Sequence, residues 1–239
     1  MDIHIYETEQ KLLLGYADLF VKTACEAQSI YGEFNVVLSG GNSPEKLYIL
    51  LASPDYSKQI IWEKINFFLG DERYVSADDP DSNAHMIKEA LFEPMNIPAS
   101  QIYTIDTSLS IDQAAEKYMD SINAFFNNGY ISFDLVMLGL GENVHTASLF
   151  PYTPVLKESS PTIKPVFIQE QHAYRITMTA ELINQARHVA FLVFGASKAS
   201  AVWQVLKGKP DQMKYPAQLI KPKNRNLYFY LDKAAADLL

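Results

Sequence analysis

Residues 133–141 read Phe-Asp-Leu-Val-Met-Leu-Gly-Leu-Gly, an apolar run that ends in two closely spaced glycines. Apolar runs of this kind are typical of strands that are buried on both faces of a parallel sheet. The same form, an apolar strand followed by glycine and polar residues, recurs at 36–41, 67–71 and 192–195. Because ligands bind beyond the carboxyl ends of strands in open parallel sheets, we expect these four turns to meet at one crevice.

Segments with helical spacing alternate with the strands along the whole chain. The pattern predicts helices over about 9–29, from near residue 44, and over 82–91, 112–126 and 197–206, and further strands over 3–6, 102–105 and 227–231. This alternation indicates an α/β fold, a mostly parallel sheet covered by helices on both faces. No repeat, low-complexity run or linker interrupts the sequence, so we expect residues 1–239 to form a single domain.

The composition excludes several classes of partner. Of the 239 residues, 20 are Lys or Arg and 28 are Asp or Glu, which gives a net charge of −8. Nucleic acid is therefore not expected as the main partner, because binding by counterion release needs a basic face. No apolar run reaches about 18 residues, so we expect no membrane partner either. A small anionic ligand remains compatible, since backbone N–H groups and a few cations can hold a phosphate.

Other features bear on location and redox chemistry. The first seven residues lack a basic segment followed by an apolar one, so we expect no secretory signal and a cytoplasmic location. The single cysteine, Cys25, cannot form an internal disulfide. We expect it to be a small buried residue rather than a nucleophile. Both a monomer and a small homo-oligomer are compatible with the sequence.

The turn at 39–44, Ser-Gly-Gly-Asn-Ser-Pro, has the features of an anion-binding loop. Gly40 and Gly41 let the backbone approach an anion, and the following helix directs free N–H groups and a positive dipole towards it. Asn42 and Ser43 add side-chain donors. The alternative is a tight strand-to-helix turn that needs no ligand. No Gly-Lys-Ser/Thr follows, so the loop is not a Walker A motif.

Charged side chains follow the other strands. Asp71 and Arg73 come directly after a buried strand, and their alternative interpretation is a surface ion pair. Arg175 and Lys198 are the cations that a phosphate would need, although a solvated lysine is equally compatible with the pattern at Lys198.

His145 follows the strongest strand, and its imidazole is suited to activating water near neutral pH. The preceding Gly139 and Gly141 do not form a dinucleotide fingerprint, because Val144 occupies the third glycine position. No second His or Cys lies near His145 at metal-ligand spacing. We therefore expect neither a cofactor nor a catalytic metal.

Taken in order, these segments resemble the 6-phosphogluconolactonase family, and the matching motifs cover most of the chain. They are Leu38–Pro44, Gly70–Arg73 with Asp81-Ser82-Asn83 downstream, Phe133–Gly141, His145–Pro151, Arg175-Ile176-Thr177 and Gly195-x-x-Lys198-Ala199. The resemblance implies a modified Rossmann-like fold that is shared with glucosamine-6-phosphate deaminase and ribose-5-phosphate isomerase. It also implies hydrolysis of a sugar-phosphate lactone, 6-phospho-D-glucono-1,5-lactone, to 6-phospho-D-gluconate in the oxidative pentose phosphate pathway.

The resemblance also implies roles for the individual residues. His145 would be the general base that activates water for attack on the lactone carbonyl. Arg73 would bind substrate and stabilise the developing negative charge, and Asp71 would orient its neighbours rather than act as a base. The Gly40-Gly41 backbone, with Asn42, Ser43, Arg175 and Lys198, would hold the phosphate.

The sequence departs from the family pattern at two places. The family usually has Asp-Gly before the histidine, where this chain has Asn143-Val144. Asparagine keeps the hydrogen bonding but lacks the charge that would raise the pKa of His145, and valine would be strained if the glycine has a positive φ. In addition, Ala84-His85 stands where an aromatic and often a basic residue are common.

Two alternatives to a lactonase follow from these observations. One is a sugar-phosphate deaminase or isomerase on the same fold, against which the Gly-Asp-Glu-Arg and Thr-Ala-Ser-Leu-Phe-Pro segments count. The other is a homologue that binds sugar phosphates without catalysis, for which Asn143-Val144 is the only support.

Overall fold

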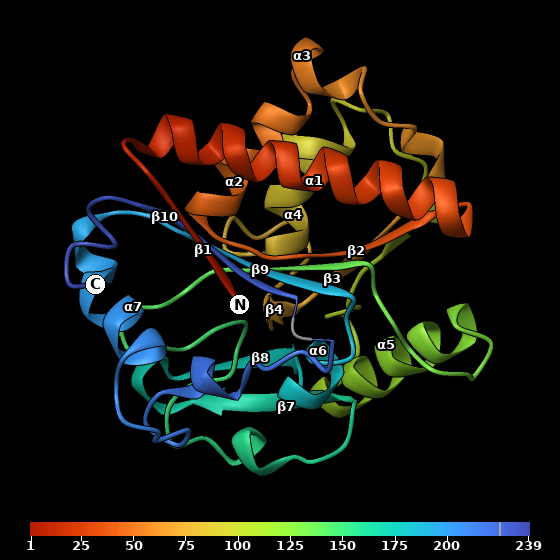
Figure 1. Ribbon diagram of the computed structural model, residues 1–239. Coiled ribbons are helices and arrows are strands. Elements are labelled where there is room, and N and C mark those ends of the chain that lie inside the picture. Colours follow the sequence, from red (N-terminus) through yellow and green to blue (C-terminus); the bar gives the residue numbers. More distant parts are fainter. Residues whose placement is uncertain (225) are drawn as a thin grey trace.

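The apolar runs of the sequence form the middle of one parallel sheet (Figure 1). The computed structural model describes residues 1–224 and 226–239. The seven strands are all parallel to their neighbours and lie in the order β1 (Asp2–Tyr6), β10 (Leu227–Asp232), β9 (His188–Val193), β6 (Leu135–Leu138), β2 (Phe34–Leu38), β3 (Ile65–Leu69) and β5 (Ile102–Tyr103).

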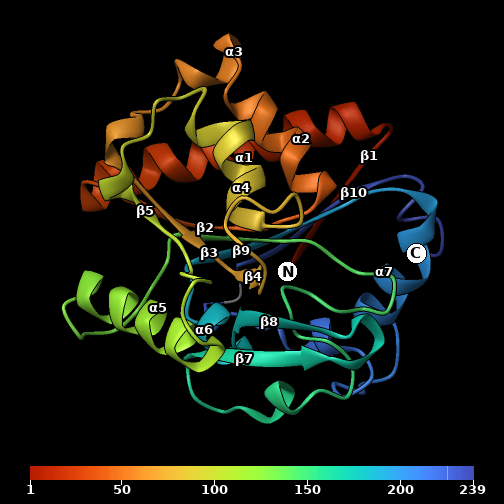
Figure 2. The same ribbon diagram turned by 180° about the vertical axis from the view of Figure 1, so that it is seen from behind.

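Side chains of the central strands alternate between two hydrophobic cores, one on each face of the sheet. Val36 and Leu38 of β2 belong to one core, and Val37 between them belongs to the other. The first face is covered by α1 (Glu9–Tyr31), α2 (Asn42–Leu51), α3 (Pro54–Ser57) and α4 (Asn83–Ile87) (Figure 2). The second is covered by α5 (Ile111–Phe125), α6 (Ala180–Ile183) and α7 (Ala199–Leu206). The predicted α/β fold is therefore confirmed.

A second, antiparallel sheet on this second face was not predicted. Its order is β4 (Asp71–Arg73), β8 (Ala173–Met178) and β7 (Ile163–Ile168). β4 follows β3 after a single residue, Gly70, and carries three charged side chains, so its sequence has none of the apolar pattern that marks a strand.

Two smaller expectations need correction. The helix predicted over 82–91 is an α-helix only over α4, which Ser82 caps by accepting a hydrogen bond from the His85 N–H, and it continues as a π-helical turn over Lys88–Phe92. Cys25 is exposed, so the expectation that it is buried was wrong. The buried face of α1 runs through Ala24, Ala27 and Gln28, and the helical period places Cys25 outside that face.

Two tyrosine hydroxyls complete the hydrogen bonding where strands β2 and β3 end. The Tyr48 hydroxyl of α2 accepts from the Ser39 N–H (3.0 Å) and donates to the Ser39 carbonyl (2.7 Å). The Tyr118 hydroxyl of α5 does the same for Leu69, at 2.7 and 3.0 Å. Both tyrosines are buried. Unpaired buried backbone groups are costly, so these hydroxyls stabilise the point at which the neighbouring strands separate.

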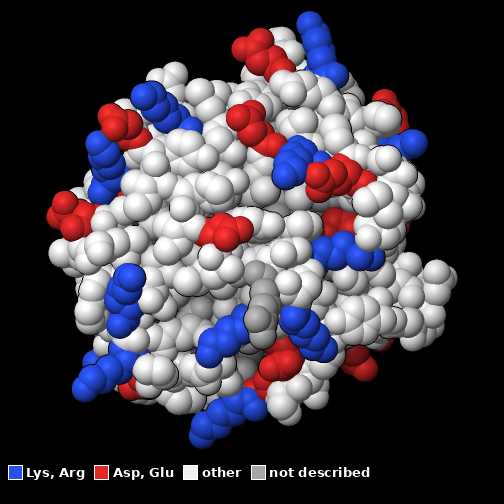
Figure 3. Space-filling model, viewed as in Figure 1, with Lys and Arg blue, Asp and Glu red and all other residues white. Residues whose placement is uncertain are grey.

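Charges of both signs are interspersed on the face shown in Figure 3. In the described part of the chain, no helix is both long and apolar enough to cross a membrane.

We predict that Tyr48→Phe lowers the free energy of unfolding by about 2 kcal/mol, because it leaves a buried N–H and a buried carbonyl of Ser39 without a partner. The measurement is urea denaturation followed by circular dichroism. Tyr103→Phe is the control, since Tyr103 is half-buried and stacks on Phe68 at 4.6 Å through its ring. Equal loss in both variants would contradict a special role for the Tyr48 hydroxyl.

Candidate functional site

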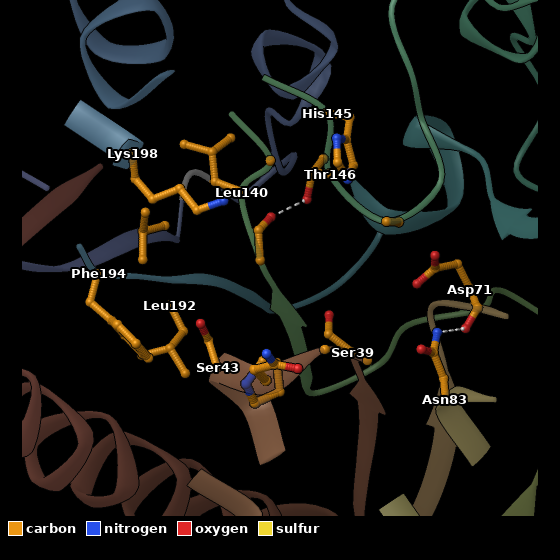
Figure 4. Close-up of a pocket in the computed structure, with 18 of the residues that line it drawn as sticks. Ser39, Ser43, Asp71, Asn83, Leu140, His145, Thr146, Leu192, Phe194 and Lys198 are labelled. Carbon is orange, nitrogen blue, oxygen red and sulfur yellow. Dashed lines mark hydrogen bonds between the residues drawn. The ribbon is translucent and has the colours of Figure 1, made fainter. Parts of the chain in front are cut away.

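A cavity of about 400 Å³ opens at the carboxyl ends of β2, β3, β6 and β9, where the four turns were expected to meet (Figure 4). All nine residues singled out from the sequence line it: Gly40, Gly41, Asn42, Ser43, Asp71, Arg73, His145, Arg175 and Lys198. Figure 4 shows Ser43 and Lys198 on one side of the cavity, Asp71 on the other, and His145 beyond Thr146. The predicted convergence of these segments is confirmed.

The turn after β2 has the geometry of an anion-binding loop. Gly41 has φ 98°, in the region that favours glycine, and α2 begins at the next residue. No side chain among the described residues caps this helix end, so its first N–H groups and its positive dipole are available to a ligand.

The two carboxylates after β3 are both buried and both accept hydrogen bonds. Glu72 is 1% exposed and accepts from three backbone N–H groups, those of Arg73, Asn83 and Ala84, each at 2.7 Å. It also accepts from the Ser82 hydroxyl at 3.1 Å. Glu72 thus anchors the start of α4 beneath the cavity, a role that sequence reasoning missed.

Asp71 connects the second sheet to the loop that carries the histidine. One of its carboxylate oxygens accepts a 2.5 Å hydrogen bond from the Ser148 hydroxyl, and Ser148 is fully buried. Burial raises the pKa of Asp71, while the Ser148 hydrogen bond and the nearby guanidiniums of Arg175 and Arg73 oppose that shift. Asp71 therefore lies where it can orient its neighbours.

Arg73 and Arg175 face each other across the antiparallel pair of β4 and β8. Like charges opposite each other in a sheet are destabilising. The Arg73 Nη1 donates to the Asp81 carbonyl, and the Arg175 Nη2 donates to the Gln171 side chain. In both side chains, however, the buried Nε has no partner among the described residues. The pair is therefore suited to hold an anion.

His145 is oriented by Asn143. The Asn143 side-chain oxygen lies 2.5 Å from the His145 Nδ1 and also accepts the His145 backbone N–H at 3.3 Å. A backbone N–H can only donate, so the Asn143 atom that faces it must be the amide oxygen, which can only accept. Nδ1 then carries the proton, and Nε2 is left with the lone pair that a base needs.

The surroundings of His145 keep its imidazole neutral. Burial, followed by the charges of Arg175, Lys198 and Arg73, lowers the pKa of His145 to about 4. The ring stacks on Phe150 with centroids 3.9 Å apart, and Phe150 also lies under the Arg175 guanidinium.

The loop path leaves little freedom around the ring. A Cβ at Gly141 would lie 2.1 Å from the Nδ1 of His145, so only glycine fits there. The Gly141 N–H donates to the His145 carbonyl at 2.9 Å. Val144 has φ 66° and is 3% exposed, so the strain expected for valine at this position is present.

Four cavity or loop residues escaped the sequence analysis: Glu72, Asn83, Ser148 and Phe150. All four lie within the motifs that carry the family resemblance. Their places in the sequence do not reveal which of these side chains are buried or which ones contact the site residues.

The chain is similar to known proteins along most of its length. The family model described as glucosamine-6-phosphate isomerases/6-phosphogluconolactonase matches residues 7–229. The 6-phosphogluconolactonase of Synechocystis sp. is 40% identical over 212 residues, which cover 87% of this chain and 85% of that protein. The one from Nostoc sp. is 35% identical, with 99% and 98% covered.

Solved structures match along the entire chain. The 6-phosphogluconolactonase of Trypanosoma brucei superimposes with a TM-score of 0.87 at 28% identity, covering 100% of this chain and 98% of that one. A monomeric glucosamine-6-phosphate deaminase has a TM-score of 0.85 at 20% identity, with both chains fully covered, and shows the shared fold alone.

We predict that the imidazole of His145 stays neutral well below pH 6 and titrates near pH 4, as burial and three nearby cations dictate. Its Cε1 proton signal, followed by NMR from pH 8 downwards, should stay constant until pH 5. Lys198→Gln should move the midpoint upwards by removing one of these charges, whereas Lys207→Gln, outside the cavity, should not. A midpoint near 6.5 in the unaltered protein would contradict the buried, cation-flanked environment.

Proposed function

The chain belongs to the glucosamine-6-phosphate isomerase/6-phosphogluconolactonase family, and on that premise we propose that it is a 6-phosphogluconolactonase that uses His145 as its base. It hydrolyses 6-phospho-D-glucono-1,5-lactone to 6-phospho-D-gluconate, the hydrolytic step of the oxidative pentose phosphate pathway. The observation that carries the proposal is the Asn143–His145 hydrogen bond, which leaves a neutral Nε2 in a cavity lined by three cations. The cytoplasmic location expected from the sequence remains part of the proposal.

The reaction needs a base and a site for negative charge. The His145 Nε2 takes a proton from water as the water oxygen forms a bond to the lactone carbonyl carbon. Negative charge then develops on the former carbonyl oxygen, where Arg73 stabilises it. When this intermediate collapses, the bond from C1 to the ring oxygen breaks, and the proton on the imidazole passes to that oxygen. The products are the acid, which ionises, and an unchanged enzyme.

The remaining cavity residues bind the phosphate. Its oxygens accept from the N–H groups of the Gly40-Gly41 turn and the start of α2, with Asn42 and Ser43 as side-chain donors. Arg175 and Lys198 supply the positive charge. The buried Arg175 Nε supports this role, since it has no partner among the described residues.

Asp71 acts in this scheme as an orienting group. One oxygen of its carboxylate accepts from the Ser148 hydroxyl, which lies three residues after His145 in the same loop. This contact ties Asp71 to the loop that carries the base. This supports the orienting role that the family resemblance implies for Asp71.

The competing reading is a homologue that binds sugar phosphates without turnover. Its support was the Asn143-Val144 pair, and the geometry weakens that support. Asn143 still sets the tautomer of His145, and Val144 accommodates the positive φ of the loop. What asparagine removes is the negative charge, which makes the imidazole a weaker base.

We expect the purified protein to accelerate hydrolysis of freshly generated 6-phosphogluconolactone, and His145→Ala to lower kcat by at least 100-fold because the base is lost. The assay couples product formation to 6-phosphogluconate dehydrogenase, with the spontaneous rate subtracted. If well-folded protein binds 6-phosphogluconate but gives no acceleration, the binding-only reading replaces the lactonase.

A pair of glycine substitutions tests the position of the imidazole. Gly141→Ala should lower kcat by about 100-fold, because the new methyl group occupies the place of the His145 ring. Gly70→Ala, which does not line the cavity, should keep kcat within about 2-fold, because its new Cβ would meet the nearest atom, on Val37, at an ordinary contact distance of 3.4 Å. Similar activity in the two variants would show that the ring position does not govern the reaction.

A further inference from the structure

Asn83 is a buried cavity residue to which the mechanism above gives no role. It is 2% exposed and is the first residue of α4. Its backbone N–H donates to Glu72, and its side-chain Nδ2 donates to the Asp71 carbonyl at 2.9 Å. Hydrogen bonds thus hold both the backbone and the side chain of Asn83, and they fix the position of the side chain in the cavity wall.

The orientation of the Asn83 amide follows from its partner. The Asp71 carbonyl can only accept, so the amide NH₂ group must face it and the amide oxygen must face away. Figure 4 shows this arrangement, with the nitrogen bonded to Asp71 and the oxygen on the side of the cavity. The amide oxygen lies against the turn at Gly40, where an added Cβ would come within 1.7 Å of it.

This oxygen is a buried acceptor that has no donor among the described residues. A buried polar atom without a partner costs about 1–3 kcal/mol, so in a cavity wall it indicates a group that a ligand satisfies. The missing partner must be a donor. An anionic oxygen is disfavoured there, since both the amide oxygen and the nearby Asp71 carboxylate would repel it.

A neutral hydroxyl group fits these requirements, and this inference rests on the proposed function. We propose that the Asn83 amide oxygen accepts a hydrogen bond from one ring hydroxyl of the sugar lactone and makes Asn83 a specificity-determining residue. A site built to bond a hydroxyl rejects the analogue that lacks it, because its own polar group is then left unpaired. Asn83 therefore selects for the hydroxyl pattern of the sugar, independently of the cations that select for the phosphate.

The test compares kcat/KM for 6-phosphogluconolactone with the values for its 2-deoxy, 3-deoxy and 4-deoxy counterparts. In the unaltered enzyme, kcat/KM for one of the three deoxy lactones should be about 10- to 100-fold below the value for the parent lactone. In Asn83→Ala, kcat/KM for the parent lactone should fall by a similar factor, and the value for that deoxy lactone should fall little further. For the other two deoxy lactones, the ratio of kcat/KM to the parent value should be the same in both enzymes. The proposal would be overturned if removing any of the three hydroxyls lowered kcat/KM by the same factor in Asn83→Ala as in the unaltered enzyme.

Two further variants separate recognition from structure. Asn83→Asp keeps an acceptor oxygen but loses the donor to the Asp71 carbonyl, so it should lose stability yet keep the discrimination between the lactones. Asn42→Ala, at the turn on the same cavity, should reduce kcat/KM by one common factor for all four lactones. If the discrimination between the lactones fell in proportion to the thermal stability of these variants, the role of Asn83 would be purely structural.

Failure of the lactonase proposal would be seen separately, as an absence of turnover of the parent lactone. The same comparison then uses Kd values from calorimetry for 6-phosphogluconate and its three deoxy forms. Loss of affinity for one deoxy form, abolished by Asn83→Ala, supports the hydroxyl contact, and equal losses in both proteins overturn it.

Discussion

The hydrogen bond from the Ser148 hydroxyl to the buried Asp71 carboxylate joins two segments that lie 77 residues apart in the chain. Asp71 begins β4, which carries Arg73, and Ser148 belongs to the loop that carries His145. Together with the hydrogen bond from the Ser148 N–H to the Thr177 hydroxyl, this contact holds the charged strand and the histidine loop at a fixed distance. Because both side chains are buried, water competes little for this contact, and the low local dielectric strengthens it.

Much of the main sheet could be predicted because its strands are buried on both faces. A strand such as β6 then contains only apolar residues, and the glycine that follows marks its carboxyl end. The second sheet gave no such signal. β4 has only three residues, all charged, and it is a strand because it pairs with β8, which lies far along the chain. Tertiary contacts of this kind leave no periodic pattern in a sequence.

The topology of the sheet predicted most of the residues that line the cavity, but it did not predict the protonation state or the hydrogen bonding of those residues. Parallel strands bring their carboxyl ends together, so eight of the nine residues, which come from four turns, could be placed at one edge of the sheet. Arg175 lies within β8, and that argument did not place it. The tautomer of His145, by contrast, depends on a 2.5 Å contact with Asn143, and its low pKa depends on burial and on three cations from other elements. Asn83 was quoted only as part of a motif, because its unpaired oxygen is visible only once Asp71 and Gly40 are in place.

Val144 shows how a departure from a family pattern can leave stability nearly unchanged. A non-glycine residue in the left-handed region costs roughly 1–2 kcal/mol, while a buried valine side chain contributes about 1.5 kcal/mol or more. At φ 66° and 3% exposure, Val144 meets both conditions, and the two effects nearly cancel. Glycine and valine at this position should therefore give proteins of similar stability, the first by avoiding backbone strain and the second by filling the core.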